Sequence, residues 1–131
     1  MKPFEFLTPS TLDEALAALH DAPSRTRLIA GGQSLLLEMK ERAATPARLV
    51  SLGGLGQLRG WRYAEFGELI VGAAITYAAL SRARLDGWHG LIPRVAGDLA
   101  DRPVRTMGTI GGALCQANPR FDMPVLTVGL D

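Results

Sequence analysis

Two glycine pairs, one in the first third of this 131-residue chain and one near its end, most restrict what it can fold into. The first turn reads Ile29-Ala30-Gly31-Gly32-Gln33-Ser34-Leu35, and the second reads Thr109-Ile110-Gly111-Gly112-Ala113-Leu114. Glycine reaches positive φ at little cost and lets a ligand touch the main chain, where successive N–H groups form an anion-binding nest. Two such turns predict one phosphate-rich ligand held from two sides.

The composition describes one globular domain or part of one. Hydrophobic residues make up 47% and charged residues 21%, which is ordinary for a soluble protein. A formal net charge of +1, with no basic arm and no nucleic-acid motif, argues against nucleic acid as a partner. The longest apolar stretch, residues 69–80, is about half of a membrane crossing, so we expect no membrane span.

Cysteine and histidine usage limits the chemistry. Cys115 is the sole cysteine, which excludes a disulfide framework, and we expect it to be buried packing rather than a nucleophile. His20 and His89 are isolated, so no metal site is predicted. The start lacks the apolar core of a signal peptide, which favours a cytoplasmic location. With no triad and no paired carboxylates, a bound cofactor must supply any reactivity.

Local patterns predict a mixture of strands and helices without regular alternation. Strands are expected over residues 4–7, 27–30, 48–52, 58–64 and 68–74, the last two as an antiparallel pair. Helices are expected over residues 12–21, 34–42, 77–80, 91–99 and 121–130. Residues 104–108 are interpreted as an irregular connection and residues 113–116 as extended. The fold class is therefore α+β rather than doubly wound.

Capping signals support the first of these helices. Either Ser10 with Asp13 or Thr11 with Glu14 forms a capping box, because each places an acid three residues after a hydroxyl. The buried face of that helix is expected to hold Leu12, Ala15, Leu16 and Leu19.

The familiar nucleotide motifs are absent. Neither glycine pair fits the G-x-G-x-x-G pattern of a Rossmann turn or the P-loop pattern. The first pair nevertheless lies between a predicted strand and a predicted helix start, where turn amides and the helix dipole attract the same anion. Two interpretations stay open at this point: a phosphate-bearing ligand, or a pair of structural turns.

Three polar side chains likewise allow either a ligand-binding role or a structural role. Ser34 and Thr109 are placed to donate to phosphate oxygens, or serve as a helix cap and a turn residue. Asp122 is suited to accept hydrogen bonds from sugar or ribityl hydroxyls, or acts as a first-turn acid that complements the helix dipole.

The residues around both turns resemble one family, the FAD-binding medium subunit of molybdenum hydroxylases, which includes the carbon monoxide dehydrogenase and xanthine dehydrogenase flavoproteins. The resemblance rests on the first loop through Leu36, Met39-Lys40 and Arg42, and on the second loop with Ala117-Asn118-Pro119 and Asp122-Met123-Pro124. Between the loops it continues through residues 49–52, 58–60, 69–73 and 103–105. It covers essentially the whole chain.

The resemblance implies an FAD-binding domain of the vanillyl-alcohol-oxidase or PCMH type, here truncated, since family members are about twice as long. It implies a first subdomain over about residues 1–55 and the start of a second over about residues 56–131. Partners would be a molybdopterin-binding large subunit and a 2Fe-2S small subunit, from which FAD passes electrons to an external acceptor. The implied cofactor contacts are Ala30, Gly31, Gly32, Gln33, Ser34, Leu35, Thr109, Ile110, Gly111, Gly112, Ala113, Asn118 and Asp122.

Three positions depart from the family pattern. Asn118 stands where an aspartate is usual, Ala113 replaces a serine or asparagine, and Leu37-Glu38 replaces a proline-bearing pair. The alternative function is a truncated, non-catalytic scaffold that keeps the fold without flavin and forms a homodimer or pairs with another subunit. A reductase of cell-wall precursor synthesis with the same fold is a further alternative, but the chain offers neither its catalytic acid nor its substrate domain.

Overall fold

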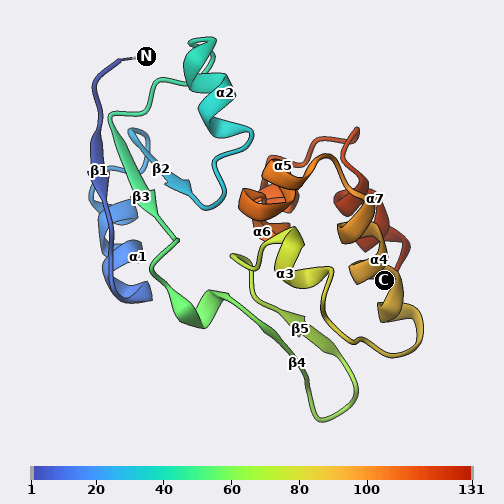
Figure 1. Ribbon diagram of the computed structural model, residues 1–131. Coiled ribbons are helices and arrows are strands. Elements are labelled where there is room, and N and C mark those ends of the chain that lie inside the picture. Colours follow the sequence, from blue (N-terminus) through green and yellow to red (C-terminus); the bar gives the residue numbers. More distant parts are fainter. Residues whose placement is uncertain (1, 131) are drawn as a thin grey trace.

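The computed structural model describes residues 2–130, which form two lobes lying side by side (Figure 1). We define the first lobe as residues 2–58 and the second lobe as residues 61–130. The first lobe contains β1 (Glu5–Leu7), α1 (Leu12–Asp21), β2 (Thr26–Ile29), α2 (Leu35–Lys40), β3 (Arg48–Ser51) and the short 3₁₀ turn η1 (Gly56–Leu58). The second lobe contains β4 (Trp61–Tyr63), β5 (Leu69–Val71), α3 (Tyr77–Leu80), η2 (Gly87–Gly90), α4 (Leu91–Asp98), α5 (Arg102–Met107), α6 (Ile110–Gln116) and α7 (Asp122–Gly129).

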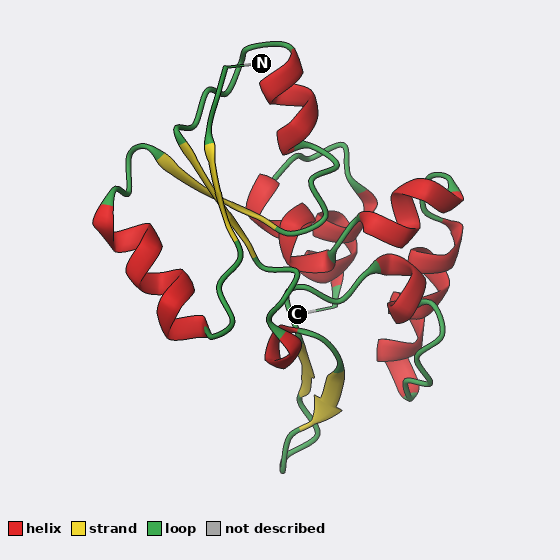
Figure 2. Ribbon diagram, turned by 60° about the vertical axis from the view of Figure 1, so that its left-hand side comes forward, coloured by secondary structure: helices red, strands yellow, loops and turns green. Residues whose placement is uncertain are grey.

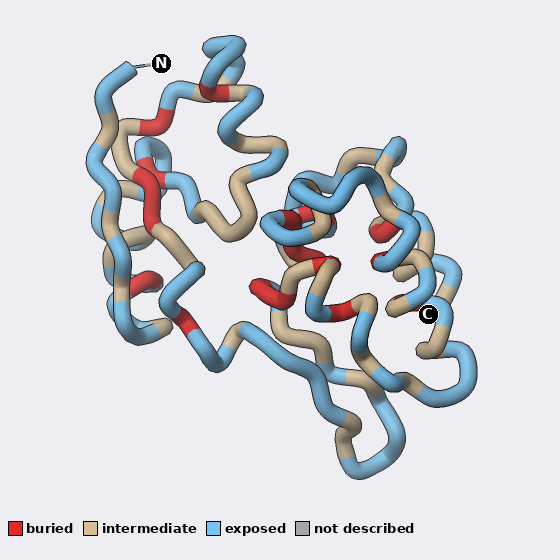
Figure 3. Tube along the Cα trace, in the orientation of Figure 1, coloured by how far each residue is buried: buried red, intermediate tan, exposed pale blue. Residues whose placement is uncertain are grey.

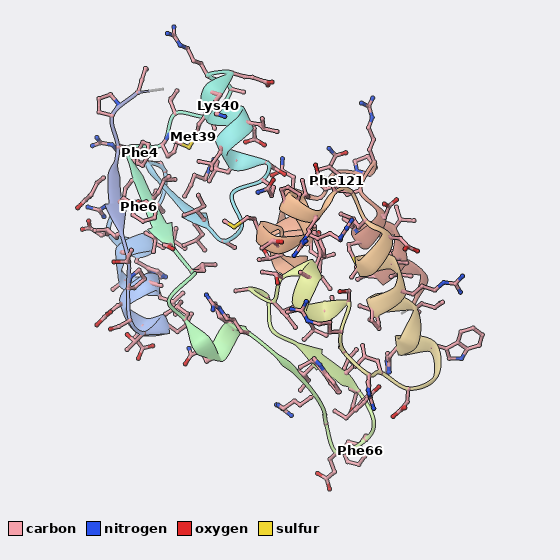
Figure 4. All side chains as sticks on the ribbon, in the orientation of Figure 1. Phe4, Phe6, Met39, Lys40, Phe66 and Phe121 are labelled. Carbon is pink, nitrogen blue, oxygen red and sulfur yellow. The ribbon has the colours of Figure 1, made fainter. Side chains whose placement is uncertain are left out.

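A three-stranded parallel sheet in the order β1-β3-β2 forms the centre of the first lobe. Helices α1 and α2 lie on opposite sides of this sheet (Figure 2). The central strand is the most deeply buried, with Leu49 and Val50 almost fully enclosed. On the α1 side, Val50 packs with Ala15 and Leu55. On the α2 side, Met39 is buried and points toward the sheet (Figure 4).

The start of α1 decides between the two predicted capping boxes. The Thr11 hydroxyl accepts the Glu14 N–H at 3.2 Å, so Thr11 is the cap. The Glu14 carboxylate accepts the Ser10 N–H and hydroxyl at 2.7 and 2.9 Å, and these bonds hold the pKa of Glu14 below its usual value. The expectation that Leu16 is buried is wrong: it is 45% exposed, because the helix turns Ala15 and not Leu16 into the core.

The second lobe packs its helices around a separate core. The buried side chains are Ile75, Tyr77, Leu80, Ile92, Ala96, Ile110, Ala113 and Met123. Strands β4 and β5 form the predicted antiparallel hairpin, with Phe66 exposed at its tip (Figure 4). Helices α4 and α7 confirm the expected helices over residues 91–99 and 121–130. Figure 3 shows the buried residues in two groups, one in each lobe.

Two segments of the second lobe differ from expectation. Residues 104–108, interpreted as irregular, belong mostly to α5, which starts because Asp101 Oδ1 accepts the Val104 N–H at 2.9 Å and Pro103 suits a first turn. Residues 113–116, interpreted as extended, belong to α6. Its start contains the second glycine pair, which normally disfavours helix. Burial of Ile110 and Ala113 in the core stabilises the helix despite these glycines.

The α+β class is confirmed by this architecture. No helix within residues 2–130 has both the length and the apolar character that a bilayer crossing requires.

Candidate functional site

A cavity of about 720 Å³ opens between the two lobes and is bordered by both glycine loops. Its volume lies within the range of sites for small molecules and cofactors. Most of the predicted site residues line it: Ala30, Gly31, Gly32, Gln33, Ser34, Leu35, Thr109, Gly111, Gly112, Ala113 and Asp122. Segments that are far apart in the sequence therefore meet at one place, as the paired turns predict.

Two predicted site residues do not line the cavity. Ile110 is 5% exposed and packs in the core of the second lobe. Asn118 instead shapes the turn before α7, because its side-chain oxygen accepts the Arg120 N–H at 3.0 Å. Their surroundings give both residues a structural role in this chain.

The first glycine loop presents a run of free main-chain donors. The N–H groups of residues 31–35 find no acceptor within residues 2–130, although all five residues line the cavity. Gly32 has φ of 70°, a left-handed conformation that side chains disfavour. The loop ends at α2, whose first hydrogen bond runs from the Leu36 N–H to the Gly32 carbonyl at 3.0 Å. Successive free amides of this kind make a nest for an anion.

The second glycine loop uses its donors inside the protein. The Ile110 and Gly111 N–H groups donate to the carbonyls of Ile75 and Ala73 at 3.2 and 2.9 Å. The Gly112 N–H donates to the Thr109 hydroxyl at 3.2 Å, which caps α6. Of the amides at positions 109–112, that of Thr109 is the one without an acceptor within residues 2–130.

One glycine in each loop is required by close packing of the main chain. A Cβ built on Gly31 would lie 2.0 Å from the Met107 carbonyl oxygen, so this glycine lets the first loop approach the end of α5. A Cβ on Gly111 would lie 2.6 Å from both the Cβ and the carbonyl oxygen of Ala73. These contacts hold the first loop against the second lobe and seat α6 on the segment after β5.

The two predicted hydroxyls differ in their partners. Ser34 occupies the N-cap position of α2 but its side chain caps nothing, so the interpretation of Ser34 as a side-chain cap is wrong. Thr109 is 6% exposed and accepts the Gly112 N–H, so it does cap its helix. Ser34 keeps its hydroxyl free at the cavity, whereas the oxygen of Thr109 is already in use.

Tyr77 is a cavity residue that sequence reasoning treated only as part of a short helix. It is 5% exposed and lines the cavity, and its ring lies against Gly108. Burial raises the pKa of the Tyr77 hydroxyl, and the charge of Asp122 raises it further. Asp122 and Tyr77 therefore lie near enough to interact across the second lobe's side of the cavity.

Cys115 corrects another expectation. The thiol was expected in the core, but Cys115 is exposed and lines the cavity. The reason is helical geometry: once residues 110–116 form α6, the core takes Ile110 and Ala113, which turns Cys115 outward.

Charged side chains of both signs reach the cavity. Arg27 and Arg120 supply positive charge, and Glu38 and Asp122 supply negative charge. The Gln116 amide donates to the Glu38 carboxylate at 2.6 Å. No group of three histidine, cysteine or acidic side chains within residues 2–130 is arranged to hold a metal ion.

The residues that line this cavity are suited to binding a ligand. Five free amides and two arginines suit a phosphate group, while Leu28, Ile29 and Leu52 among the lining residues offer an apolar wall. An elongated ligand with an anionic centre, such as a flavin dinucleotide, fits this donor set.

Comparison with known proteins agrees with the geometry. Residues 2–131 match the family described as the FAD binding domain in molybdopterin dehydrogenase. The carbon monoxide dehydrogenase medium chain of Hydrogenophaga pseudoflava is 36% identical over 98% of this chain and 45% of its own length. The chain thus spans less than half the length of the curated relatives it matches.

Solved structures show the same relationship. Carbon monoxide dehydrogenase from Hydrogenophaga pseudoflava superposes with a TM-score of 0.87 at 34% identity, over 97% of this chain and 44% of that one. Quinoline 2-oxidoreductase from Pseudomonas putida 86 superposes with a TM-score of 0.84 at 34% identity, over 96% and 45%. The fold is therefore that of the PCMH-type FAD-binding domain, and the chain belongs to the family of FAD-binding domains of molybdopterin dehydrogenases, whose cofactor is FAD.

Proposed function

We propose that this chain is the FAD-binding part of an electron-transfer subunit of a molybdenum hydroxylase. The observation that carries the proposal is the run of unpaired amides at residues 31–35 on a cavity between two lobes. Family membership identifies the ligand as FAD, and the free donors would suit recognition of its pyrophosphate.

Different residues of the cavity would bind different parts of FAD. The amides of Gly31 to Leu35 and the free Thr109 N–H would hold the pyrophosphate, with the Ser34 hydroxyl as a further donor. Asp122 would accept a hydrogen bond from a hydroxyl of the cofactor. When bound, the flavin would supply the redox chemistry.

We propose the partners that the resemblance to molybdenum hydroxylases implies, and the names of the relatives support a place in a multi-subunit enzyme. One relative is the medium chain of carbon monoxide dehydrogenase and another is the FAD-binding subunit of xanthine dehydrogenase. This chain would accordingly work beside a molybdopterin-binding large subunit and a 2Fe-2S small subunit, receiving electrons from the clusters and passing them to an external acceptor. The two subdomains would meet near residue 55.

The test is binding of FAD to the purified chain. We expect flavin absorbance, or quenching of flavin fluorescence on titration with FAD. We also expect ADP to compete with FAD, because it shares the phosphates held by the first loop, and riboflavin to bind more weakly. Absence of any FAD binding would overturn the proposal.

A second function has one observation in its favour. Val125 and Val128 are 61% and 80% exposed on α7, and such a surface favours association. A non-catalytic scaffold that forms a homodimer or pairs with another subunit would use it. Sedimentation combined with the flavin spectrum separates the two functions: a colourless dimer supports the scaffold, and a coloured complex with the other subunits supports electron transfer.

A further inference from the structure

Few hydrogen bonds join the two lobes within residues 2–130. Near the chain connection, the Ala74 N–H donates to the Leu58 carbonyl at 2.8 Å. Away from it, the hydrogen bond between Gln116 and Glu38 is the one that crosses from the second lobe to the first within residues 2–130. The main chain of Gly31 also packs against Met107 of the second lobe. Glu38 and Gln116 both line the cavity, so its width on the side of α2 and α6 depends on whether their hydrogen bond holds.

The position of Glu38 couples this bond to the first glycine loop. Glu38 lies on α2 and its N–H donates to the Ser34 carbonyl at 3.1 Å, one helical turn after the free amides. Its own carbonyl accepts the N–H groups of Ala43 and Ala44 at 2.8 and 3.2 Å, which anchors this end of the helix. A pull on the Glu38 side chain is therefore transmitted to the loop that lines the cavity.

Gln116 lies on the helix that follows the second glycine loop, as Glu38 lies on the helix that follows the first. It is the last residue of α6, the helix that begins at the second glycine loop. The contact thus joins the helix that follows the first loop to the helix that follows the second, and both residues line the cavity.

The negative charge of Glu38 gives its hydrogen bond to Gln116 a second role at the cavity. A carboxylate bordering a phosphate site repels the ligand unless it is neutralised or hydrogen-bonded. Within residues 2–130 its side chain makes one hydrogen bond, to the Gln116 amide, and it makes no salt bridge. A hydrogen bond to a charged group is among the stronger kinds.

We propose that the bond between Glu38 and Gln116 is a latch, which holds the two lobes around the cavity and slows release of the bound dinucleotide. The inference rests on the proposed function for the identity of the ligand. Glu38 and Gln116 act as positioning residues, because they set the separation of the two loops.

The experiment follows FAD release by stopped flow from wild type and variants of the whole chain. Gln116→Ala should release FAD about 3- to 10-fold faster with little change in the association rate, because the lost contact holds the closed state. Gln116→Glu should release it faster still, since two carboxylates then face each other. Gln57→Ala, on exposed η1 outside the cavity, is the matched control and should leave release unchanged.

The swapped pair separates a latch from a merely structural contact. Glu38→Gln combined with Gln116→Glu places the amide on α2 and the carboxylate on α6, so the same bond can form in reverse. We expect the double variant to release FAD more slowly than Gln116→Glu alone. Release from Gln116→Ala at the wild-type rate, or no recovery in the swapped pair, would overturn the latch.

A second measurement keeps the two proposals distinct. If wild type binds no FAD, the proposed function fails, and the latch is then judged on the ligand-free chain by small-angle X-ray scattering. Gln116→Glu should increase the radius of gyration relative to wild type and to Gln57→Ala. An unchanged radius would overturn the latch independently of FAD.

Discussion

The two glycine loops look alike in sequence but differ in what their main-chain amides do. In residues 31–35, which line a cavity, the amides find no acceptor within residues 2–130, whereas in residues 110–112 they donate to Ala73, Ile75 and Thr109. In our proposal, the first loop therefore receives the anionic part of the ligand. The second is built to seat a helix on the rest of its lobe.

A glycine pair therefore serves two separate structural purposes. At Gly31 and Gly111 the missing side chain makes room for neighbouring backbone, which is a packing requirement. At Gly32 it permits a left-handed conformation that turns the chain into the helix while leaving amides unpaired. The expected two-sided cradle thus becomes, in our proposal, a cradle supplied mainly by the first loop.

The largest effect should come from filling the two packing positions. Gly31→Ala and Gly111→Ala each force a Cβ into backbone atoms at 2.0 and 2.6 Å, so we expect the free energy of unfolding to fall by about 3 kcal/mol. Urea denaturation measures this. Gly56→Ala, where a Cβ meets nothing within 4 Å, is the control and should change stability by less than about 0.5 kcal/mol. Equal stability of all three variants would contradict the packing role.

Amide hydrogen exchange tests the comparison directly. Without FAD, the amides of residues 31–35 should exchange rapidly and those of residues 111–113 slowly, because only the latter are hydrogen-bonded. Saturating FAD should slow the first group by at least about 10-fold and leave the second nearly unchanged. Equal slowing in both loops would restore the two-sided cradle predicted from the sequence.

The two hydroxyls provide a smaller test. Thr109→Ala removes a helix cap and should lower the free energy of unfolding by about 1 kcal/mol. Ser34→Ala removes no such bond and should leave stability within about 0.5 kcal/mol while weakening FAD binding. Thermal denaturation with and without FAD measures both. If Ser34→Ala costs as much stability as Thr109→Ala, the two loops are more alike than the structure indicates.

The smallest expected effect is the contribution of Tyr77, on the second lobe's side of the cavity, to the pH dependence of stability. Because burial raises the pKa of Tyr77, the folded state favours its neutral form. This contribution is complete below the unfolded pKa of about 10 and is lost as the pH rises from there through the folded pKa. Tyr77→Phe should therefore flatten the decline of stability above about pH 10, measured by urea denaturation at several pH values. An unchanged decline would exclude Tyr77 as its source.

Local sequence signals predicted much of the fold. The capping box of α1, the hairpin of β4 and β5, and α7 with Met123 inward were all readable from residue spacing. The errors fall where tertiary contacts override local preference. The glycine pair hid the helix α6. Cys115 was predicted to be buried from the general preference of free cysteine for the interior, but α6 turns it outward.

The candidate site was predictable as a set of residues but not as an arrangement. Sequence spacing pointed to both loops and to Asp122, and the resemblance pointed to the cofactor. Tyr77 and the contact between Glu38 and Gln116 carried no such signal, because each acquires its place only when distant helices meet.

Residue identity and local spacing were enough to predict the family and the strand–turn–helix unit around the first glycine pair. Which amides stay free depends instead on how distant segments pack together. An N–H group is satisfied or left open by the carbonyls that other segments bring to it. Ala73 and Ile75 bring them to the second loop, whereas the first loop is left facing the cavity.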